Sequence, residues 1–414
     1  MSRQSAAGST AFAILVVLSL CHMVNDVNQS LLMAIYPTVK DNLGLSFAQI
    51  GVITLAYQVT ASLLQPAIGL FTDRKPLYRS VSVAMLFTGG GLLLLSRAET
   101  YPSLLMAAML VGTGSAVFHP ESSRIARLAS GGRHGLAQSI FQVGGNSGQA
   151  IGPLLAALIV LVRGQGSIAW FSLVALLASA ALWRVGGWYR QQSRRVDAAR
   201  KTVVGRRFGR RQTAIALAVL ACLVFSKNVY MVSLSSFYTF YLMDTFHLSV
   251  RDSQICLFVF LGASAAGTLV GGPIGDRIGR KSVIWVSILG AVPFALALPY
   301  VGFYATIGLS VVIGLILASA NAAIIVYGQE LVPGRVGTIA GLFFGLSFGF
   351  AGIGAALLGI LADHTSIRFV YQVSSFLPLL GLLTAFLPEM REQRVLPTVS
   401  PLAGQDLLSD RNPM

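Results

Sequence analysis

The chain has 414 residues, of which 55% are hydrophobic and only 11% charged. A soluble domain carries roughly a quarter charged residues, so this composition excludes a protein that exposes most of its surface to water. We therefore predict an all-α membrane protein, in which the formal net charge of +15 reports where cations lie and does not indicate a nucleic-acid partner.

Apolar windows follow one another along almost the whole chain. A helical span needs about 20 mainly apolar residues, and the first such window, Ala11 to Tyr36, is too long for a signal-peptide core, so we expect it to be retained. Twelve transmembrane helices are predicted, six in each half. Their centres fall near Val24, Ser62, Gly89, Leu110, Gly148, Ala175, Ser226, Gly262, Gly290, Ile313, Phe348 and Leu379.

One segment occurs twice. Residues 272–281 read GPIGDRIGRK, and a less regular copy, GLFTDRKPLYR, begins 203 positions earlier at Gly69. The same offset pairs Asn25 with Asn228. A register held over this distance predicts two homologous halves that form pseudo-symmetric six-helix bundles.

Lysine and arginine concentrate on one side of the predicted spans. With a cytoplasmic N-terminus, 24 of the 30 fall in the cytoplasmic connections and tails, so the positive-inside tendency places both termini in the cytoplasm. We expect bundles at 1–188 and 213–390, a basic linker at 189–212 and a cytoplasmic tail at 391–414. The linker is expected to lie on anionic lipid headgroups.

The first predicted span carries a polar stripe. His22, Asp26, Gln29 and Met33 recur at steps of 4, 3 and 4, which places them on one helix face. A carboxylate in mid-span costs about 2.5 to 3.5 kcal/mol on insertion scales, so we expect Asp26 to face a water-filled cavity and to carry a proton. The alternative is an Asp26 that is hydrogen-bonded to His22 or Asn25 for packing alone.

The repeated segment places a glycine, an acid and several cations in a turn between two helices. The glycine permits close helix approach, and the acid can complement the N-terminus of a neighbouring helix. We expect a conformational latch, with a simple marker of topology as the alternative. The predicted latch residues are Gly69, Asp73, Arg74, Gly272, Asp276, Arg277 and Arg280.

The fourth and fifth spans add further polar groups. Glu121 and His119 are the second candidates for proton coupling, and Gln142 and Asn146 belong to a polar stripe that indicates a solvated pathway. Two alternatives stay open. Glu121 can be an ion-pair partner of Arg124, and His119 can be satisfied by a hydrogen bond without titrating.

The seventh span contains a cation in its middle. Subtracting 203 from Lys227 gives position 24, close to the depth of Asp26 on the first span. Two bundles related by a pseudo-two-fold axis along the membrane normal would place both helices beside a shared cavity. Our hypothesis is that Asp26 and Lys227 interact across this cavity when it is empty, and the alternative is a Lys227 that snorkels to the interface.

The expected substrate site consists of polar residues on these spans. Its predicted members are Lys227, His22, Asn25, Gln142, Asn146 and Tyr230. The three cysteines show no paired spacing, the glycine-rich stretches follow no strand, and no nucleophile-base set appears. We therefore expect no metal, no cofactor and no enzymatic activity.

Two six-helix halves with Gly-x-x-x-Asp-Arg in the corresponding turn of each resemble the major facilitator superfamily. The segments 115–124, 131–139, 225–227 and 362–366 are similar to a bacterial drug-efflux branch of that family. The resemblance covers about residues 12–388, and the first turn departs from the pattern at Pro76 and Leu77. It implies a monomeric bacterial inner-membrane transporter.

The resemblance also implies an activity. The protein would export small anionic drugs such as fosmidomycin, a phosphonate with a hydroxamate, by proton antiport and alternating access. Lys227 is the group that would meet the anionic end of the drug. The alternatives are uptake or exchange of a small phosphorylated or anionic metabolite, and a membrane sensor or scaffold that transports nothing.

Overall fold

The computed structural model describes residues 10–45, 47–199 and 208–390, and within these ranges the regular structure is entirely helical. Ten helical segments in this part of the chain are long and apolar enough to cross a membrane. A shorter apolar helix, Ser80–Ser96, and the interrupted helix that begins at His134 complete the twelve. The predicted all-α membrane fold is confirmed, and the predicted centres fall within these twelve segments, Gly290 at the break within the ninth.

Among the described residues, the first half contains nine α-helices. They are α1 (Phe12–Ala34), α2 (Tyr36–Leu43), α3 (Phe47–Gln58), α4 (Leu64–Arg74), α5 (Ser80–Ser96), α6 (Tyr101–Ala129), α7 (His134–Leu155), α8 (Leu161–Arg163) and α9 (Ala169–Ala199). Short π-helical segments at Val59–Leu63 and Ala156–Val160 join α3 to α4 and α7 to α8, so each joined run forms one span. A 3₁₀ turn, Gln165–Ile168, precedes α9.

Seven α-helices are described in the second half. They are α10 (Arg210–Phe246), α11 (Val250–Ile278), α12 (Arg280–Leu289), α13 (Val292–Ala297), α14 (Phe303–Leu331), α15 (Val336–His364) and α16 (Ile367–Ser374). A 3₁₀ turn, Leu298–Tyr300, extends α13, and a 3₁₀ segment, Leu377–Phe386, extends α16. The ninth span is broken between α12 and α13, just before Pro293, because proline cannot donate the next helical hydrogen bond.

The helices extend into the predicted linker 189–212. Helix α9 continues to Ala199 and α10 begins at Arg210, so only a short stretch separates the halves. Arginine, glutamine and alanine are good helix formers, so a span rich in them can continue beyond the apolar region. Residues 200–207 and the predicted tail 391–414 lie outside the described residues.

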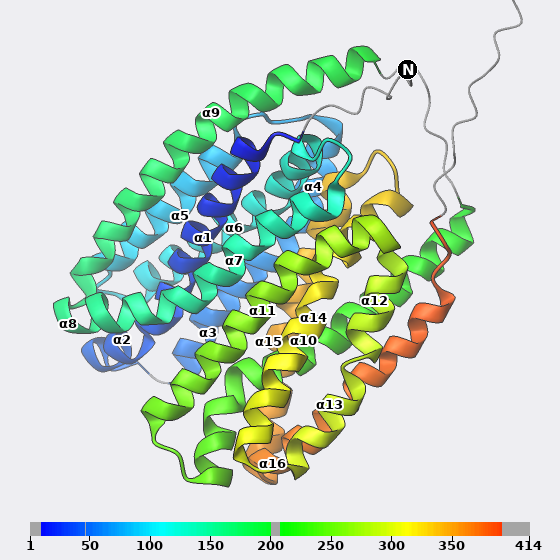
Figure 1. Cartoon of the computed structure of the whole chain (residues 1–414). Coiled ribbons are helices and arrows are strands. Elements are labelled where there is room, and N and C mark those ends of the chain that lie inside the picture. The colour runs from blue at the N-terminus through cyan, green and yellow to red at the C-terminus, as the bar shows by residue number, and fades with distance from the viewer. Residues whose placement is uncertain (1–9, 46, 200–207, 391–414) are drawn as a thin grey trace, which may run out of the picture.

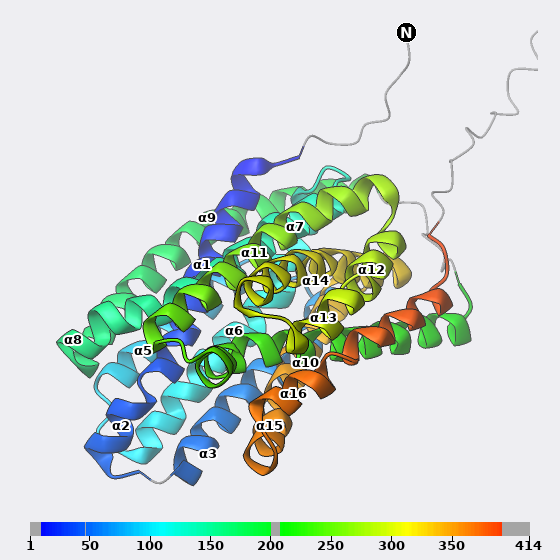
Figure 2. The same ribbon diagram turned by 60° about the horizontal axis from the view of Figure 1, so that its bottom comes forward.

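The two halves lie side by side (Figure 1), with the first half coloured from blue to green and the second from green through yellow to orange-red. Two pairs of helices make the main contacts between them, namely α7 with α11 and α4 with α15. Figure 2 shows α7 and α11 adjacent in a second view. These pairs occupy corresponding positions in the two halves, as expected for two bundles related by pseudo-symmetry.

Glycines on α15 show how the contact between α4 and α15 changes along its length. A Cβ added at Gly69 of α4 would collide with the backbone of Gly337, and one at Gly341 would collide with the backbone of Gln65 on α4. A Cβ at Gly345 would lie 2.6 Å from the carbonyl oxygen of Ser62. At Gly349, further along the same helix, a Cβ would meet nothing within 4 Å. The halves are therefore tightly joined at one end and diverge toward the other.

The contact between α7 and α11 follows the same gradient. A Cβ at Gly135 or Gly272 would collide with the backbone of the opposite helix, whereas at Gly262 it would meet nothing within 4 Å. We call the tightly joined end the latch end. It includes the start of α1, where the backbone N–H of Ala11 donates to the carbonyl of Ala129.

Close packing within the first half gives a testable prediction. A Cβ at Gly144 of α7 would collide with the Ser19 carbonyl of α1, whereas one at Gly90 of α5 would meet nothing within 4 Å. We expect Gly144→Ala to lower the free energy of unfolding by about 1–3 kcal/mol through overpacking. Gly90→Ala, the matched control, should be neutral or stabilise by up to about 1 kcal/mol through helix propensity.

Thermal unfolding of the purified protein in detergent measures both changes. Equal midpoints for the two variants would contradict the packing that the structure shows between α1 and α7.

Candidate functional site

A cavity of about 240 Å³ lies between the two halves. The side chains that line it belong to α1, α6 and α7 of the first half and to α10, α11, α14 and α15 of the second. It lies beyond the tight part of the α7–α11 contact, where Asn146 still donates to Thr268 Oγ1 across the halves at 2.8 Å. The cavity is therefore sealed at the latch end.

Helix α10 presents one face to this cavity. The lining residues from this helix are Val224, Lys227, Asn228, Met231, Val232 and Ser235, which recur at helical spacing. Tyr230, predicted to orient substrate, falls between them on a different face. It is buried among Tyr238, Tyr371 and other residues of the second-half core and does not line the cavity.

Lys227 is the cation of the cavity. Its side chain is 5% exposed, and its ammonium donates to the side-chain oxygen of Asn321 on α14. No carboxylate lies within ion-pair distance of it among the described residues. A buried charge without a counter-ion is costly, so this ammonium favours the binding of an anion from the cavity.

Asp26 lies on the opposite wall. Its carboxylate accepts hydrogen bonds from Asn25 at 3.1 Å, Gln29 at 3.1 Å and Gln149 at 3.0 Å. Asn25, predicted to orient substrate, reaches Asp26 and does not line the cavity. Gln142 and Asn146, predicted for the same role, do line it.

Two histidines complete the wall around Asp26. The Nε2 atoms of His22 on α1 and His119 on α6 lie 3.2 Å apart. The same atoms lie 3.5 Å and 3.8 Å from Asp26 Oδ1, and all three side chains are at most 4% exposed. His119 also contacts the rings of Phe344 and Phe348 on α15, with centroid distances of 5.1 Å and 5.3 Å. The sequence predicted a polar stripe on α1 but not this contact between spans.

The direct contact hypothesised between Asp26 and Lys227 is absent in this conformation. Lys227 bonds Asn321, and the titratable neighbours of Asp26 are His22 and His119. Both charges nevertheless line the same cavity. The cavity thus has a cation on the wall of the second half and a histidine–carboxylate cluster on the wall of the first.

Glu121 does not belong to this cavity. Its side chain is fully buried and pairs with Arg124 NH1 at 3.0 Å, one turn along α6. This is the ion-pair alternative to its predicted proton-carrying role. Arg124 links Glu121 to Asp73, because its NH2 also contacts Asp73 Oδ1 at 2.5 Å.

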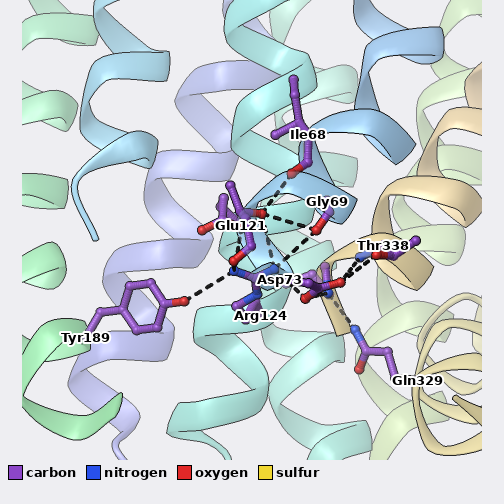
Figure 3. Close-up of polar contacts among 11 residues, drawn as sticks. Ile68, Gly69, Asp73, Glu121, Arg124, Tyr189, Gln329 and Thr338 are labelled. Carbon is purple, nitrogen blue, oxygen red and sulfur yellow. Dashed lines mark hydrogen bonds and ion pairs between the residues drawn. The ribbon is translucent and has the colours of Figure 1, made fainter. Parts of the chain in front are cut away.

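Asp73 joins the two halves at the latch end (Figure 3). Its carboxylate accepts hydrogen bonds from the backbone N–H of Gly337 at 3.0 Å and of Thr338 at 2.7 Å. The hydroxyl of Thr338 donates to it at 2.6 Å. These groups belong to the first turn of α15, whose unpaired N–H groups and positive dipole end favour an anion. Figure 3 shows Arg124 beside Asp73 on the α6 side of this contact.

Asp276 makes the corresponding contact from the second half. Its carboxylate accepts hydrogen bonds from the backbone N–H of Gly135 and of Leu136, both at 2.9 Å, in the first turn of α7. Arg280 pairs with Asp276 at 2.9 Å and with Glu330 at 3.1 Å. The other predicted latch cations, Arg74 and Arg277, are exposed.

Several of the residues at these sites were not singled out by the sequence. Arg124 was expected only as a partner of Glu121. Nothing in the sequence indicated that the first turns of α7 and α15 are the ones that donate to the two carboxylates. The one available signal was positional, since each of these helices begins directly after a short loop at the same end as the repeated segment. Backbone N–H groups leave no mark on the amino-acid sequence.

A family model agrees with this architecture. The model of the Major Facilitator Superfamily matches residues 18–346 and 228–412. Two relatives match nearly the whole chain. The fosmidomycin resistance protein of Escherichia coli (strain K12) is 55% identical over 384 residues, which cover 93% of this chain and 95% of that protein. An uncharacterized MFS-type transporter of Bacillus subtilis (strain 168) is 40% identical over 393 residues, 94% of this chain and 95% of that protein.

Solved structures with the same fold include two proton-coupled sugar symporters. The E. coli fucose:proton symporter in the outward conformation has a TM-score of 0.70 at 12% identity, covering 92% of this chain and 100% of that one. The proton:xylose symporter XylE has a TM-score of 0.71 at 13% identity, covering 92% and 97%. At this identity the likeness concerns the fold alone.

The Asp73 contact gives a testable prediction. Asp73→Asn removes the charge that pairs with Arg124 and faces the first turn of α15, and hydrogen bonds to charged groups contribute about 1.5–3 kcal/mol. We expect the population closed at the latch end to fall about tenfold or more relative to the open one. Spin labels at Leu77→Cys and Arg335→Cys, both exposed on opposite halves, report this as a longer distance.

The matched control is Asp363→Asn, since Asp363 is an exposed carboxylate at the other end of α15. The label distances should stay as in the parent chain. A distance distribution for Asp73→Asn that equals this control would show that the contact does not hold the latch end closed.

Proposed function

This chain belongs to the Major Facilitator Superfamily, and we propose that it exports small anionic drugs of the fosmidomycin type from the cytoplasm in exchange for protons. The observation that carries the proposal is the buried ammonium of Lys227, which faces the central cavity without a carboxylate partner. An anionic substrate supplies the missing counter-charge. The relative named for resistance to fosmidomycin supports this substrate class.

The surroundings of Lys227 suit a phosphonate. Asn228 and Asn321 line the cavity beside it, and Ser264 and Ser347 add hydroxyl groups. An ammonium with neutral hydrogen-bond donors around it binds strong acceptor oxygens without adding a competing negative charge. The apolar part of the drug would lie against Phe344 and Phe348, which line the same cavity.

The latch contacts support alternating access. Asp73 and Asp276 each bind the first turn of a helix from the other half, so we propose that breaking both contacts opens this end of the cavity. The distribution of lysine and arginine favours a cytoplasmic position for the latch end. The conformation described here would then be the one from which substrate leaves the cell.

The proton is proposed to bind at the cluster of Asp26, His22 and His119. These residues line the same cavity as Lys227, so occupancy by a proton and by the drug can be coupled through the arrangement of the two halves. Glu121, the other candidate, is held by Arg124 in the network of the latch. We propose that Glu121 supports the latch and does not carry the transported proton.

The membrane setting follows from the same reasoning. We propose a multi-pass protein of the bacterial inner membrane, with both termini in the cytoplasm and active as a monomer. Arg190 and Arg194 are exposed on the last turns of α9, within the predicted basic segment. Cations at this position would contact anionic lipid headgroups, each contributing about 1 kcal/mol.

Accumulation of labelled fosmidomycin in cells with and without the protein tests the function. Export predicts lower accumulation in cells that produce the protein, and an uncoupler that collapses the proton gradient should abolish the difference. Higher accumulation would favour the alternative, uptake or exchange of an anionic metabolite. No flux in either direction would favour a sensor or scaffold.

Substitution of the cavity cation tests the proposed site. Lys227→Ala should lower apparent drug affinity by about 10- to 150-fold, because a hydrogen bond to a charged group contributes about 1.5–3 kcal/mol. Lys227→Arg keeps the positive charge, so its apparent drug affinity should fall less. Transport into inverted membrane vesicles, normalised to the amount of protein, measures these affinities.

Arg97→Ala serves as the matched control, because Arg97 is an exposed cation at the end of α5. It should transport like the parent chain. Equal affinity for Lys227→Ala and Arg97→Ala would refute an anion site at Lys227.

A further inference from the structure

Hydrogen bonds to backbone carbonyls fix the tautomers of the two cavity histidines. His22 Nδ1 lies 2.8 Å from the carbonyl oxygen of Phe141, and His119 Nδ1 lies 2.9 Å from that of Ser115. The Ser115 hydroxyl, 3.2 Å from His119 Nδ1, can accept the same hydrogen. A carbonyl oxygen can only accept, so each Nδ1 must carry a hydrogen and donate it. In a neutral imidazole the other nitrogen then has a lone pair and no hydrogen.

The remaining nitrogens face each other. The Nε2 atoms of His22 and His119 lie at hydrogen-bond distance, 3.2 Å. Two neutral rings with both Nδ1 atoms protonated would set one lone pair against the other there. A hydrogen bond between these atoms requires one additional proton, which makes the pair a shared imidazole–imidazolium with a charge of +1.

Asp26 supplies the compensating charge. Its Oδ1 lies 3.5 Å from His22 Nε2 and 3.8 Å from His119 Nε2. Amide groups of Asn25, Gln29 and Gln149 donate to its two oxygens. Both carboxylate oxygens act as acceptors in these hydrogen bonds, so the geometry fits Asp26 as the counter-ion and not as the holder of the proton.

We propose that the proton exchanged by this transporter is held between Nε2 of His22 and Nε2 of His119, with the Asp26 carboxylate as its counter-ion. The inference rests on the proposed proton antiport and assigns its proton to particular atoms. The shared proton forms a hydrogen bond between His22 on α1 and His119 on α6. When it leaves, the two lone pairs repel, so proton occupancy is linked to the relative position of these helices, and this conformation is the loaded one.

The other ionisable groups around the histidine pair each have another partner. On α3, the Tyr57 hydroxyl donates to Gln29. On α10, Lys227 lies across the cavity and bonds Asn321. On α6, Glu121 pairs with Arg124. On α1, the thiol of Cys21 points to the carbonyl of Ala178 on α9. Helices α7 and α15 place uncharged residues against the histidine rings, among them Phe141, Gly145 and Phe344.

The direct test uses the full-length wild-type chain with ¹⁵N-labelled histidine in lipid nanodiscs. The chain has only five histidines, so His22→Gln and His119→Gln assign the signals. We expect a correlation across a hydrogen bond between two Nε2 nuclei, lost in either variant. Two neutral rings without such a correlation overturn the proposal. So does one divalent metal ion per chain, measured by elemental analysis and lost in both variants.

A second test measures transport in proteoliposomes. The readout is the ratio of drug accumulation driven by a pH gradient to drug exchange at equal pH, because exchange needs no net proton movement. This ratio should fall at least tenfold in His22→Gln and in His119→Gln. His364→Gln, at an exposed histidine outside the cavity, is the matched control and should keep the parent ratio.

The outcomes separate the two proposals. If the ratio of gradient-driven accumulation to exchange falls in Asp26→Asn but stays at the parent value in both histidine variants, the proton resides on the carboxyl and the assignment is wrong. If the wild-type chain exchanges drug but shows no gradient-driven accumulation, proton antiport itself fails, and the ¹⁵N spectrum still decides whether the histidines share a proton.

Discussion

Two carboxylates bind helix N-termini across the halves and join the two bundles at the latch end in this conformation. Asp73 and Asp276 lie in the last turns of α4 and α11, where the negative end of the helix dipole disfavours a carboxylate. Their side chains bind the first turns of α15 and α7, where the positive dipole end favours one. Each contact therefore reduces an unfavourable dipole interaction at one helix end and forms a favourable one at another. Because the sequence is duplicated, the same interaction occurs twice around the axis between the bundles, and the latch end is closed on both sides of it.

The cavity next to this closed end carries different charges on its two walls. The second half contributes Lys227, a buried ammonium whose partner is a neutral amide. The first half contributes Asp26 with two histidines, a group that is neutral overall when the pair shares one proton. One wall thus lacks a negative charge, and the other can gain or lose a positive one. An exchanger of anions for protons needs these two properties in one chamber.

Hydrophobicity and repetition made the fold predictable. Spans follow from composition, and the copies of the turn at Gly69 and Gly272 reveal the halves, because both signals are local in the chain. The repeat also singled out the two carboxylates at the latch end, Asp73 and Asp276, and their role as a conformational latch stays a prediction. The contact of His22 with His119 was not predictable, since it depends on the rotation of α1 against α6. Tyr230 was misplaced because a polar residue near Lys227 in sequence can still face the core of its own bundle.

At their closest approach the two halves meet backbone against backbone, through glycines at positions 69, 135, 272, 337 and 341. No rotamer change can loosen these contacts by degrees, so this part of the barrier to leakage of ions does not depend on the side chains that line the chamber. Those side chains are therefore free to vary. New drug specificities can evolve in this scaffold by substitutions around the cavity without compromising the permeability barrier of the cell.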